Sequence, residues 1–313
     1  MDERILKEAV QRHCPKADGK IGLEPIPTGK FNSSFFVRAG NEQLVLRVAP
    51  PDDDVFVFYE KEMMRQEPEL HRLLLEGSSV PVAPIVAFDD SREVVDRNFL
   101  LMERLPGRPL TEAPEIDFDR VLFQVGEYLK QAHGLRAEQY GYLGAHRPME
   151  PQSNWESAFV VMWNRMIDDI VGVGFYDEKE SGFMRRLLDE RLELFSRQAP
   201  SCMLHMDIWL QNILVGDRGE VSGIVDWDRG LWGDPEIEFA VLDYCGISEP
   251  AFWEGYGQAR DRSPEAQVRQ VFYLLYEIQK YIVIRAGRNG DRLGARGYKD
   301  RVMEIVRQGL LAR

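Results

Sequence analysis

The chain has few cysteines and no long apolar run. Its three cysteines, Cys14, Cys202 and Cys245, are odd in number and follow no ligand spacing, which predicts neither disulfide bonds nor a zinc site. No apolar run approaches the roughly 18 residues that a membrane helix needs, and residues 1–4 (Met-Asp-Glu-Arg) are charged where a signal peptide would be apolar. We therefore expect a cytoplasmic protein with no membrane partner.

Basic residues are also outnumbered: 39 Lys and Arg stand against 52 Asp and Glu, a net charge of −13. Nucleic-acid binding demands a basic surface, so this balance argues against a nucleic-acid partner. The negative charge favours attraction of a cationic small molecule, or it serves solubility alone. The 313 residues, 44% of them hydrophobic, suit a globular protein of two domains or lobes.

The most informative segment covers residues 205–228. It contains Asp207, Asn212 five positions later and Asp226 fourteen positions beyond that, each within apolar, strand-like sequence. Phosphoryl transfer needs a base that orients the acceptor hydroxyl and hard oxygen ligands for magnesium. Kinase folds hold these groups in this order and spacing. We therefore expect Asp207 to be the catalytic base, and Asn212 and Asp226 to bind Mg²⁺.

Other residues near this segment are less specific. His205 has no second histidine at ligand spacing, so we expect it to shape the loop through hydrogen bonds rather than to bind metal. For Asp228 two interpretations stay open: it contacts a second metal ion, or it is a solvated residue of the turn. Trp209 and Trp232 are candidates for an aromatic wall of the acceptor site. The arginine-rich stretch 285–301 is most simply a solvated loop and helix.

Hydrophobic periodicity divides the chain into a strand-rich and a helical part. In the first part we expect a helix at 2–13, strands near 21–27, 33–39, 43–49, 84–88 and 97–104, and a long helix at 55–76. Pro68 should kink or split that helix. A turn at residues 105–109 contains Pro and Gly and ends the strand. In the second part we expect short strands near 212–216 and 221–226, and helices at 117–133, 153–171, 181–197, 236–243, 249–259, 264–286 and 298–311.

This pattern predicts an α+β fold of two lobes. A small β-sheet lobe at residues 1–104 would bind the nucleotide, and a mainly helical lobe at residues 105–313 would carry the catalytic loop and the acceptor site. The hinge is expected at about residues 103–107.

The motifs together resemble the aminoglycoside phosphotransferase-type kinases, small-molecule kinases of protein-kinase-like fold that also include choline kinase-like and fructosamine kinase-like enzymes. The resemblance extends over residues 28–244. Two positions depart from the family pattern. Met206 stands at the glycine of H-G-D-x-x-x-x-N, and Glu238 stands at the second aspartate of G-D-P-x-x-D-L-A, where an acidic residue braces the catalytic loop. Both changes leave the groups that perform the chemistry intact.

The resemblance implies further roles in the first lobe. Arg47 stands where kinases place the strand lysine that holds the α- and β-phosphates. Its partner carboxylate is expected to be Glu67, with Glu60 and Glu62 as alternatives. Residues 28–34 match the family's turn over the phosphates, although an ordinary hairpin turn is the alternative reading. The cofactor-binding residues implied there and at the hinge are Thr28, Gly29, Asn32, Ser33, Ser34, Glu103 and Leu105, the last two through backbone groups near the adenine or guanine.

The resemblance implies a Mg²⁺-requiring phosphotransferase that uses ATP or GTP and phosphorylates a hydroxyl of a small molecule. An aminoglycoside or other antibiotic is the first acceptor hypothesis, with a role in antibiotic resistance. A metabolic kinase for a choline-, sugar- or amino-alcohol-type acceptor is the second, and a nucleotide-binding pseudokinase the third. The acidic residues considered for contact with an ammonium group are Glu156, Asp168, Asp169, Asp243 and Glu249. Neither the acceptor, nor the choice of ATP or GTP, nor the oligomeric state follows from the sequence.

Overall fold

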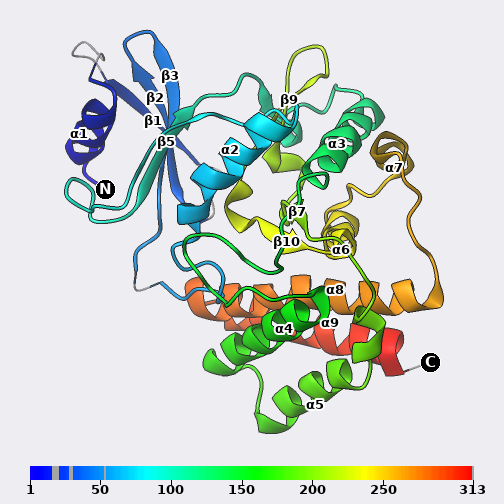
Figure 1. Cartoon of the computed structure of the whole chain (residues 1–313). Helices are drawn as coiled ribbons and strands as arrows, with labels where there is room; N and C mark the ends of the chain where they lie inside the picture. Colours follow the sequence, from blue (N-terminus) through cyan, green and yellow to red (C-terminus); the bar gives the residue numbers. More distant parts are fainter. Residues whose placement is uncertain (16–20, 28–30, 53, 312–313) are drawn as a thin grey trace.

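The computed structural model describes residues 1–15, 21–27, 31–52 and 54–311. An antiparallel sheet of five strands forms the N-terminal part, and helices dominate the rest (Figure 1). The sheet has the order β1-β2-β3-β5-β4. Its strands are β1 (Ile21–Ile26), β2 (Ser33–Ala39), β3 (Glu42–Val48), β4 (Ile85–Asp89) and β5 (Phe99–Glu103).

The two faces of β3 carry different side chains because neighbouring residues of a strand point to opposite faces. Leu44, Leu46 and Val48 are buried in a cluster with α1 (Glu3–His13), which covers one face of the sheet. Val45 packs in a separate cluster on the opposite face. Arg47, two residues along, therefore points to that second face, toward the helical part of the molecule.

The prediction of a helix at 55–76 is wrong for about the first third of that range, residues 55–62. A 3₁₀ turn at Met63–Gln66 precedes α2 (Glu67–Gly77), and Pro68 lies in the first turn of α2. Proline is tolerated there because its missing N–H would have no helical partner in any case, so Pro68 begins the helix and does not kink it. The segment before it instead buries Val57 and Tyr59 among the C-terminal helices.

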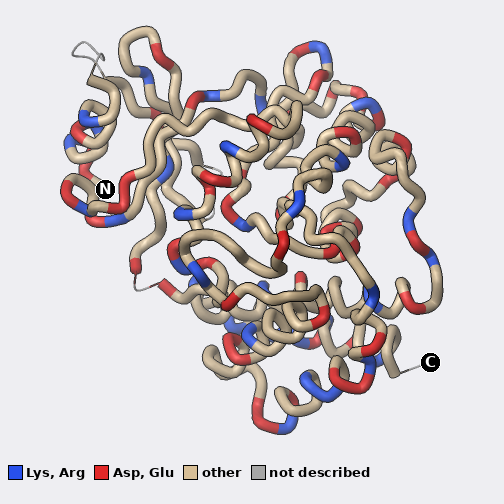
Figure 2. The backbone as a smooth tube through the Cα atoms, viewed as in Figure 1, with Lys and Arg blue, Asp and Glu red and all other residues tan. Residues whose placement is uncertain are grey.

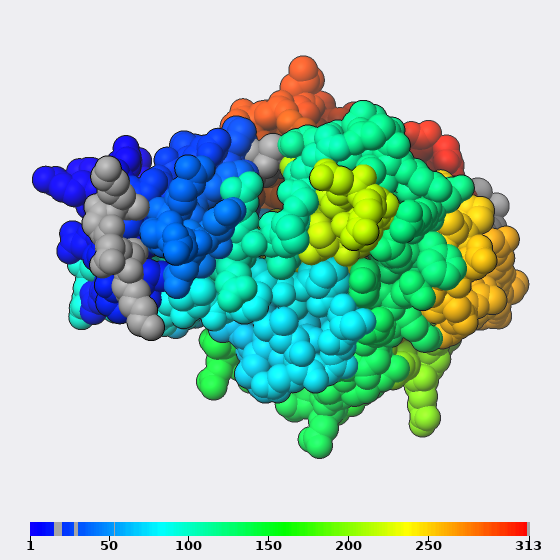
Figure 3. Space-filling model, turned by 90° about the horizontal axis from the view of Figure 1, so that it is seen from above, coloured from blue at the N-terminus to red at the C-terminus, as the bar shows by residue number. Residues whose placement is uncertain are grey.

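The C-terminal part contains seven helices among the described residues. They are α3 (Phe118–Ala132), α4 (Trp155–Gly172), α5 (Glu178–Asp189), α6 (Pro235–Cys245), α7 (Pro250–Tyr256), α8 (Pro264–Val283) and α9 (Arg292–Val306). The last helix begins before the expected residue 298 because the Asp291 side chain caps it by accepting from the Gly294 N–H. A π-helical turn at Ile284–Arg288 lies between α8 and α9. Seen from above, the N-terminal elements lie at one end of the molecule and α7 at the other (Figure 3).

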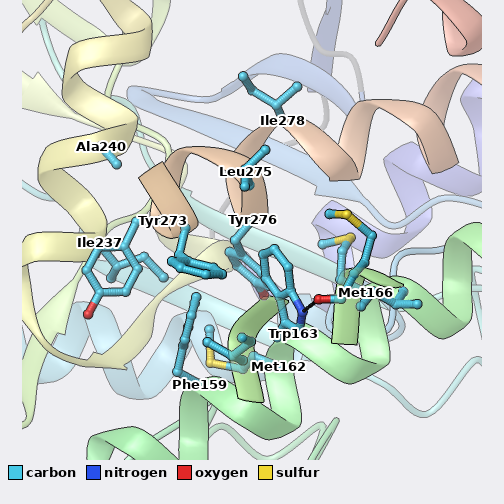
Figure 4. Close-up of a cluster of buried hydrophobic side chains, with 14 of the residues drawn as sticks. Phe159, Met162, Trp163, Met166, Ile237, Ala240, Tyr273, Leu275, Tyr276 and Ile278 are labelled. Carbon is cyan, nitrogen blue, oxygen red and sulfur yellow. Dashed lines mark hydrogen bonds between the residues drawn. The ribbon is translucent and has the colours of Figure 1, made fainter. Parts of the chain in front are cut away.

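The largest core lies between α4, α6 and α8 (Figure 4). Phe159 and Trp163 of α4 are fully buried against α8: the ring centres of Phe159 and Tyr273 are 5.1 Å apart, and those of Trp163 and Phe272 are 5.6 Å apart. The Trp163 indole N–H donates to the Met184 carbonyl at 3.0 Å, which satisfies its buried polar group. This core fixes α8, and α8 in turn forms one wall of the cleft described below.

Short strands hold the segment between α5 and α6. Two small sheets pair β7 (Cys202–Leu204) with β10 (Leu231–Gly233), and β6 (Arg108–Pro109) with β8 (Ile213–Val215) and β9 (Val221–Ile224). Residues 205–212 therefore connect β7 to β8, and residues 225–230 connect β9 to β10, so that both segments run between the two small sheets. Within the described residues, no helix is both long and apolar enough to cross a membrane.

Candidate active site

A cleft with a volume of about 1260 Å³ lies between the sheet and the C-terminal helices. Its lining comes from both parts of the molecule, including β3, residues 102–105, both loops of the 205–228 segment and α8. A pocket for one small ligand typically has about 300–1,000 Å³. The cleft therefore has room for a nucleotide and a second small molecule side by side.

His205 and Met206 shape the loop that carries Asp207. His205 is fully buried and contacts the Val225 carbonyl through Nε2 at 2.9 Å, while its Nδ1 accepts from the Asp207 N–H at 3.1 Å. These bonds tie the loop after β7 to the loop after β9. Met206 adopts φ +68°, a left-handed conformation, and its carbonyl accepts from Arg229 at 2.6 Å.

Asn212 is held directly against Asp207. Its Nδ2 donates to the Asp207 carbonyl at 2.9 Å and to the Asp207 Oδ2 at 3.2 Å. Because the amide nitrogen is turned to Asp207, the amide oxygen faces away from it. Asp226 adopts φ +73°, and its side chain is 40% exposed at the cleft.

Arg47 joins the sheet to the second loop. Its guanidinium contacts Glu67 Oε2 at 2.5 Å, Asp226 Oδ1 at 2.5 Å and Asp228 Oδ2 at 2.8 Å. Asp228 also accepts from the Asn32 Nδ2 at 3.1 Å. Asp228 is only 5% exposed, so the interpretation as a solvated turn residue is wrong.

The partner of Arg47 is Glu67, which is fully buried on α2. The two alternatives have other partners. Glu60 pairs with Arg288 beyond α8, and Glu62 lies 3.3 Å from Arg65. Glu67 reaches Arg47 because α2 begins at this residue, which directs its side chain toward the sheet.

The charges of this network shift its pKa values. Burial opposes the charge of Arg47, but the Glu67, Asp226 and Asp228 carboxylates outweigh it and hold the pKa of Arg47 above its ordinary value. Burial raises the pKa of Glu67 to about 7, partly offset by Arg47. Burial, reinforced by Asp226, raises the pKa of Asp228 well above its ordinary value. Burial and the mutual repulsion of the carboxylates thus outweigh the single guanidinium in the pKa values of Glu67 and Asp228.

Asn212 and Asp226 fit a magnesium ion by their donor chemistry. The Asn212 amide oxygen faces away from Asp207, and the Asp226 Oδ1 is the oxygen that accepts from Arg47, which leaves Oδ2 for another partner. Mg²⁺ is usually held by one or two carboxylates together with substrate phosphates rather than by an all-protein cage. In keeping with that, the described part of the chain contains no group of three or more His, Cys, Asp and Glu side chains arranged to hold a metal.

The residues expected at the nucleotide end are only partly at the cleft. Asn32 and Ser34 line it, whereas Ser33 does not, and Thr28 and Gly29 lie outside the described residues. At the expected hinge, Glu103 and Leu105 both line the cleft. The Glu103 N–H donates to the Pro84 carbonyl at 3.0 Å, so this amide is already used within the sheet.

One wall of the cleft was missed by the sequence interpretation. Lys280, Arg285, Arg288 and Arg301 all line it, although residues 285–301 were expected to be solvated. Lys280 is 5% exposed, contacts Glu277 at 2.6 Å and lies 3.7 Å from Asp207 Oδ1. The signal that was available in the sequence is a lysine five positions before Arg285 within a largely apolar helical stretch.

None of the acidic residues considered for ammonium binding lines the cleft. Asp168 pairs with Arg185, Asp243 pairs with Arg260, and Asp169 accepts from a backbone N–H in the segment before α2. Of the two tryptophan candidates, Trp209 lines the cleft, whereas Trp232 is buried in a core cluster.

Several curated proteins with similar sequences are named as kinases. A probable ketoamine kinase of Vibrio parahaemolyticus is 23% identical over 271 residues, which cover 83% of this chain and 85% of the relative. The hygromycin-B 4-O-kinase of Escherichia coli is 23% identical over 241 residues, 72% of this chain and 63% of the relative.

Solved structures of related enzymes share the fold. A thermostable mutant of aminoglycoside phosphotransferase APH(4)-Ia matches with a TM-score of 0.69 at 19% identity, covering 96% of this chain and 99% of that chain. The same enzyme is known in a ternary complex with ADP and hygromycin B. A putative fructosamine-3-kinase from Haemophilus somnus matches with a TM-score of 0.68 at 17% identity, covering 95% and 96%.

These likenesses confirm the expected α+β, protein-kinase-like fold with a small antiparallel sheet and a mainly helical C-terminal part. The family model described as the phosphotransferase enzyme family (APH) matches residues 22–270, most of the chain. The protein therefore belongs to the APH phosphotransferase family and is a small-molecule kinase by family.

Proposed function

We propose that this protein transfers the γ-phosphoryl group of ATP or GTP to a hydroxyl of a small molecule. The observation that carries the proposal is the convergence of Asp207, Asn212, Asp226 and Arg47 on one cleft. The first two are hydrogen-bonded to each other, and the last two form an ion pair. The naming of relatives as kinases and the ADP complex of one structural neighbour support the same chemistry.

Asp207 is the proposed catalytic base. Its carboxylate is about one-third exposed at the cleft, so it can accept the proton of an acceptor hydroxyl. Asn212 holds the carboxylate, and the His205 ring accepts from the Asp207 backbone N–H. Arg47, held by Glu67, would bind donor phosphate oxygens. Mg²⁺ bound by Asn212 and Asp226 would neutralise the phosphate charge during transfer.

We also propose the lobe division expected from the sequence. Residues 1–104 would bind the nucleotide, residues 105–313 would bind the acceptor, and residues 103–107 would be the hinge. In support, β5 ends at Glu103, β6 begins at Arg108, and Gly107 between them has φ +94°. Close backbone contacts also leave no room for a Cβ atom at Gly107.

The acceptor remains a choice between two classes. The hygromycin-B kinase among the relatives supports an aminoglycoside or other antibiotic, and the probable ketoamine kinases support a metabolic compound. The charge of the cleft favours the second class, since four cations line its C-terminal wall and the acidic residues considered for aminoglycoside contact lie elsewhere.

The test of the proposed function is transfer of labelled phosphate from ATP and GTP to a mixture of antibiotics and hydroxylated metabolites. Asp207→Asn should lower kcat by about two to four orders of magnitude, because general-base catalysis contributes that much, and it should leave nucleotide affinity nearly unchanged. An equal loss of nucleotide affinity would contradict the assignment of Asp207 as the base. Nucleotide binding without transfer to any acceptor would instead support a pseudokinase.

A further inference from the structure

The end of the cleft beyond Asp207 has an unusual charge. Residues 244–301 contribute nine side chains to its lining, among them four cations and no carboxylate. These nine are Tyr244, Cys245, Lys280, Tyr281, Ile284, Arg285, Arg288, Asn289 and Arg301. Elsewhere the protein has an excess of acidic residues, with a net charge of −13, and both signs are mixed along the chain (Figure 2).

Two of the four cations, Lys280 and Arg301, form a continuous strip with two tyrosine rings, and this strip leads to Asp207. The Arg301 guanidinium lies 5.2 Å from the Tyr244 ring centre, and the Tyr244 and Tyr281 rings are 5.8 Å apart. Lys280 lies 5.0 Å from the Tyr281 ring and 3.7 Å from Asp207 Oδ1. A molecule bound along this strip would reach from Asp207 at one end to Arg301 at the other.

Most of these positive charges already have acidic partners, but one does not. Lys280 pairs with Glu277 at 2.6 Å, Arg288 pairs with Glu60, and the half-exposed Arg285 lies 3.3 Å from Asp291. Arg301, exposed on α9, forms no ion pair with any residue that the structure describes. The uncompensated charge thus lies at the far end of the strip, away from the catalytic loop.

We propose that the acceptor is a hydroxyl compound that carries an anionic group, a carboxylate or a phosphate ester, and that Arg301 and Arg285 bind this group. The tyrosine rings between would pack against its carbon skeleton, and its hydroxyl would lie at Asp207. The inference rests on the proposed function for the role of Asp207. It opposes a polycationic acceptor, because Arg301 and Arg285 would repel its ammonium groups.

The test compares four sugars of similar size and different charge: D-glucose, D-glucosamine, D-gluconate and D-glucose 6-phosphate. Their affinities for the full-length protein are measured by calorimetry, with and without Mg²⁺ and ADP. Both anions should bind about tenfold more tightly than glucose, since hydrogen bonds to a charged group contribute that much, and glucosamine should bind most weakly. The comparison of D-gluconate with D-glucose 6-phosphate shows whether a carboxylate or a phosphate ester is preferred. The proposal is overturned if neither anion binds more tightly than glucose, or if none of the four sugars binds.

Single variants show which side chains cause the tighter binding of the anions. Arg301→Gln and Arg285→Gln should each weaken binding of the preferred anion roughly tenfold, and Arg301→Glu should reverse the order in favour of glucosamine. Arg296→Gln is the matched control, because Arg296 is exposed on the same helix and does not line the cleft. If Arg296→Gln weakens anion binding as much as Arg301→Gln, the effect is one of overall charge and the proposal fails.

The proposed function and this inference fail in different ways. ADP affinity and Mg²⁺-dependent phosphoryl transfer are measured on the same preparations. If Arg301→Gln and Arg285→Gln weaken ADP binding but leave anion binding intact, the cations serve the donor phosphates and only the inference is lost. If the wild-type protein neither binds ADP nor transfers phosphate, the proposed function is lost, while the charge preference of the strip is still read from the measurements without nucleotide.

Discussion

At the scale of single residues, Met206 occupies a backbone position that favours glycine. Its φ of +68° costs a residue with a Cβ atom about 1–2 kcal/mol. The Met206 side chain is fully buried in the core cluster that contains α4 and α8. Burial of this side chain offsets the backbone strain, which explains how the loop keeps its conformation without the glycine of the family motif.

Substitution of Met206 separates these two effects. Met206→Ala and Met206→Gly should both destabilise the protein by about 2–4 kcal/mol through lost packing. The glycine variant should be the more stable of the two by about 1 kcal/mol, because it relieves the strain, and this reverses the order usual for residues with negative φ. Urea unfolding of both variants measures the difference. An alanine variant more stable than the glycine variant, as at residues with negative φ, would mean that no strain is present at this position.

Asp169 is a second residue whose surroundings make a measurable prediction. It lies on α4, accepts from the Phe58 N–H at 2.7 Å, and burial raises its pKa from 3.8 to about 6. Because the folded state holds this proton more tightly than the unfolded state, Asp169 favours folding fully below about pH 4. That contribution is lost as the pH rises through 6.

Asp169→Asn should therefore stabilise the protein at pH 8, by about 1–2 kcal/mol after allowance for partial exposure, and should change little at pH 4. The amide oxygen can still accept from Phe58. Thermal unfolding from pH 4 to 8 measures the effect, with the exposed neighbour Asp168→Asn as control. A stabilisation that does not grow with pH would show that the cost of burying the Asp169 charge is negligible.

At the scale of elements, the first turn of α6 braces the loop that carries Asp207. Glu238 Oε1 accepts from the Met206 N–H at 2.6 Å, and Oε2 contacts His133 Nε2 at 2.6 Å. His133 in turn contacts the Tyr256 hydroxyl through Nδ1 at 2.8 Å. The longer side chain of Glu238, compared with the aspartate of the family motif, thus still reaches the loop and links it to α3 and α7.

Glu238→Ala should disturb the loop without touching the nucleotide. It leaves the Met206 N–H and a His133 nitrogen buried without a partner, which costs about 2–4 kcal/mol of stability. Because Asp207 follows directly, kcat should fall at least tenfold while the KM for nucleotide stays within about twofold. Glu238→Gln, which can still accept from Met206, should recover most of kcat.

Asp243→Ala provides the control for the Glu238 variants. Asp243 lies on the same helix, but its exposed side chain pairs with Arg260 away from the loop. Steady-state kinetics of the three variants distinguish a role of Glu238 in positioning Asp207 from a role in stability alone. A Glu238→Ala enzyme with normal kcat would show that Glu238 stabilises the fold and does not position Asp207.

At the scale of the whole molecule, the sheet and the helical part meet through charged contacts at the cleft. Arg47 of β3 binds Asp226 and Asp228, and Arg288 beyond α8 binds Glu60. A nucleotide bound with Mg²⁺ between the two parts would add contacts to both. Ligand binding should therefore raise the stability of the entire molecule.

We expect ATP or GTP at one hundred times its Kd to stabilise the wild-type protein by about 2.7 kcal/mol when Mg²⁺ is present. Asp226→Asn removes a charge but keeps a residue that tolerates the left-handed conformation. If it weakens binding tenfold, the gain at the same concentration falls to about 1.4 kcal/mol. Thermal unfolding with and without Mg²⁺ measures this, and an unchanged dependence on Mg²⁺ would count against Asp226 as a ligand.

Local features of the sequence were sufficient to predict much of the fold. Short strand-like apolar runs predicted β2 and β3, and a motif of polar residues between apolar runs predicted the loops that carry Asp207 and Asp226. The errors have identifiable causes. Residues 55–62 were included in the expected helix but bury Val57 and Tyr59 against distant helices, and an Asp cap extends α9 toward its N-terminus. Such effects depend on contacts that periodicity does not contain.

The sequence by itself determined the family, the kinase-like fold and the residues expected to perform phosphoryl transfer, because those residues lie close together in the chain at a characteristic spacing. Only the tertiary structure decided that Glu67 is the partner of Arg47, that Asp228 is buried, and that Lys280 lies beside Asp207. It also decided the positive charge of the cleft wall formed by residues 244–301, since Tyr244 and Arg301 come from helices far apart in the sequence and are brought together by the packing of the helical core.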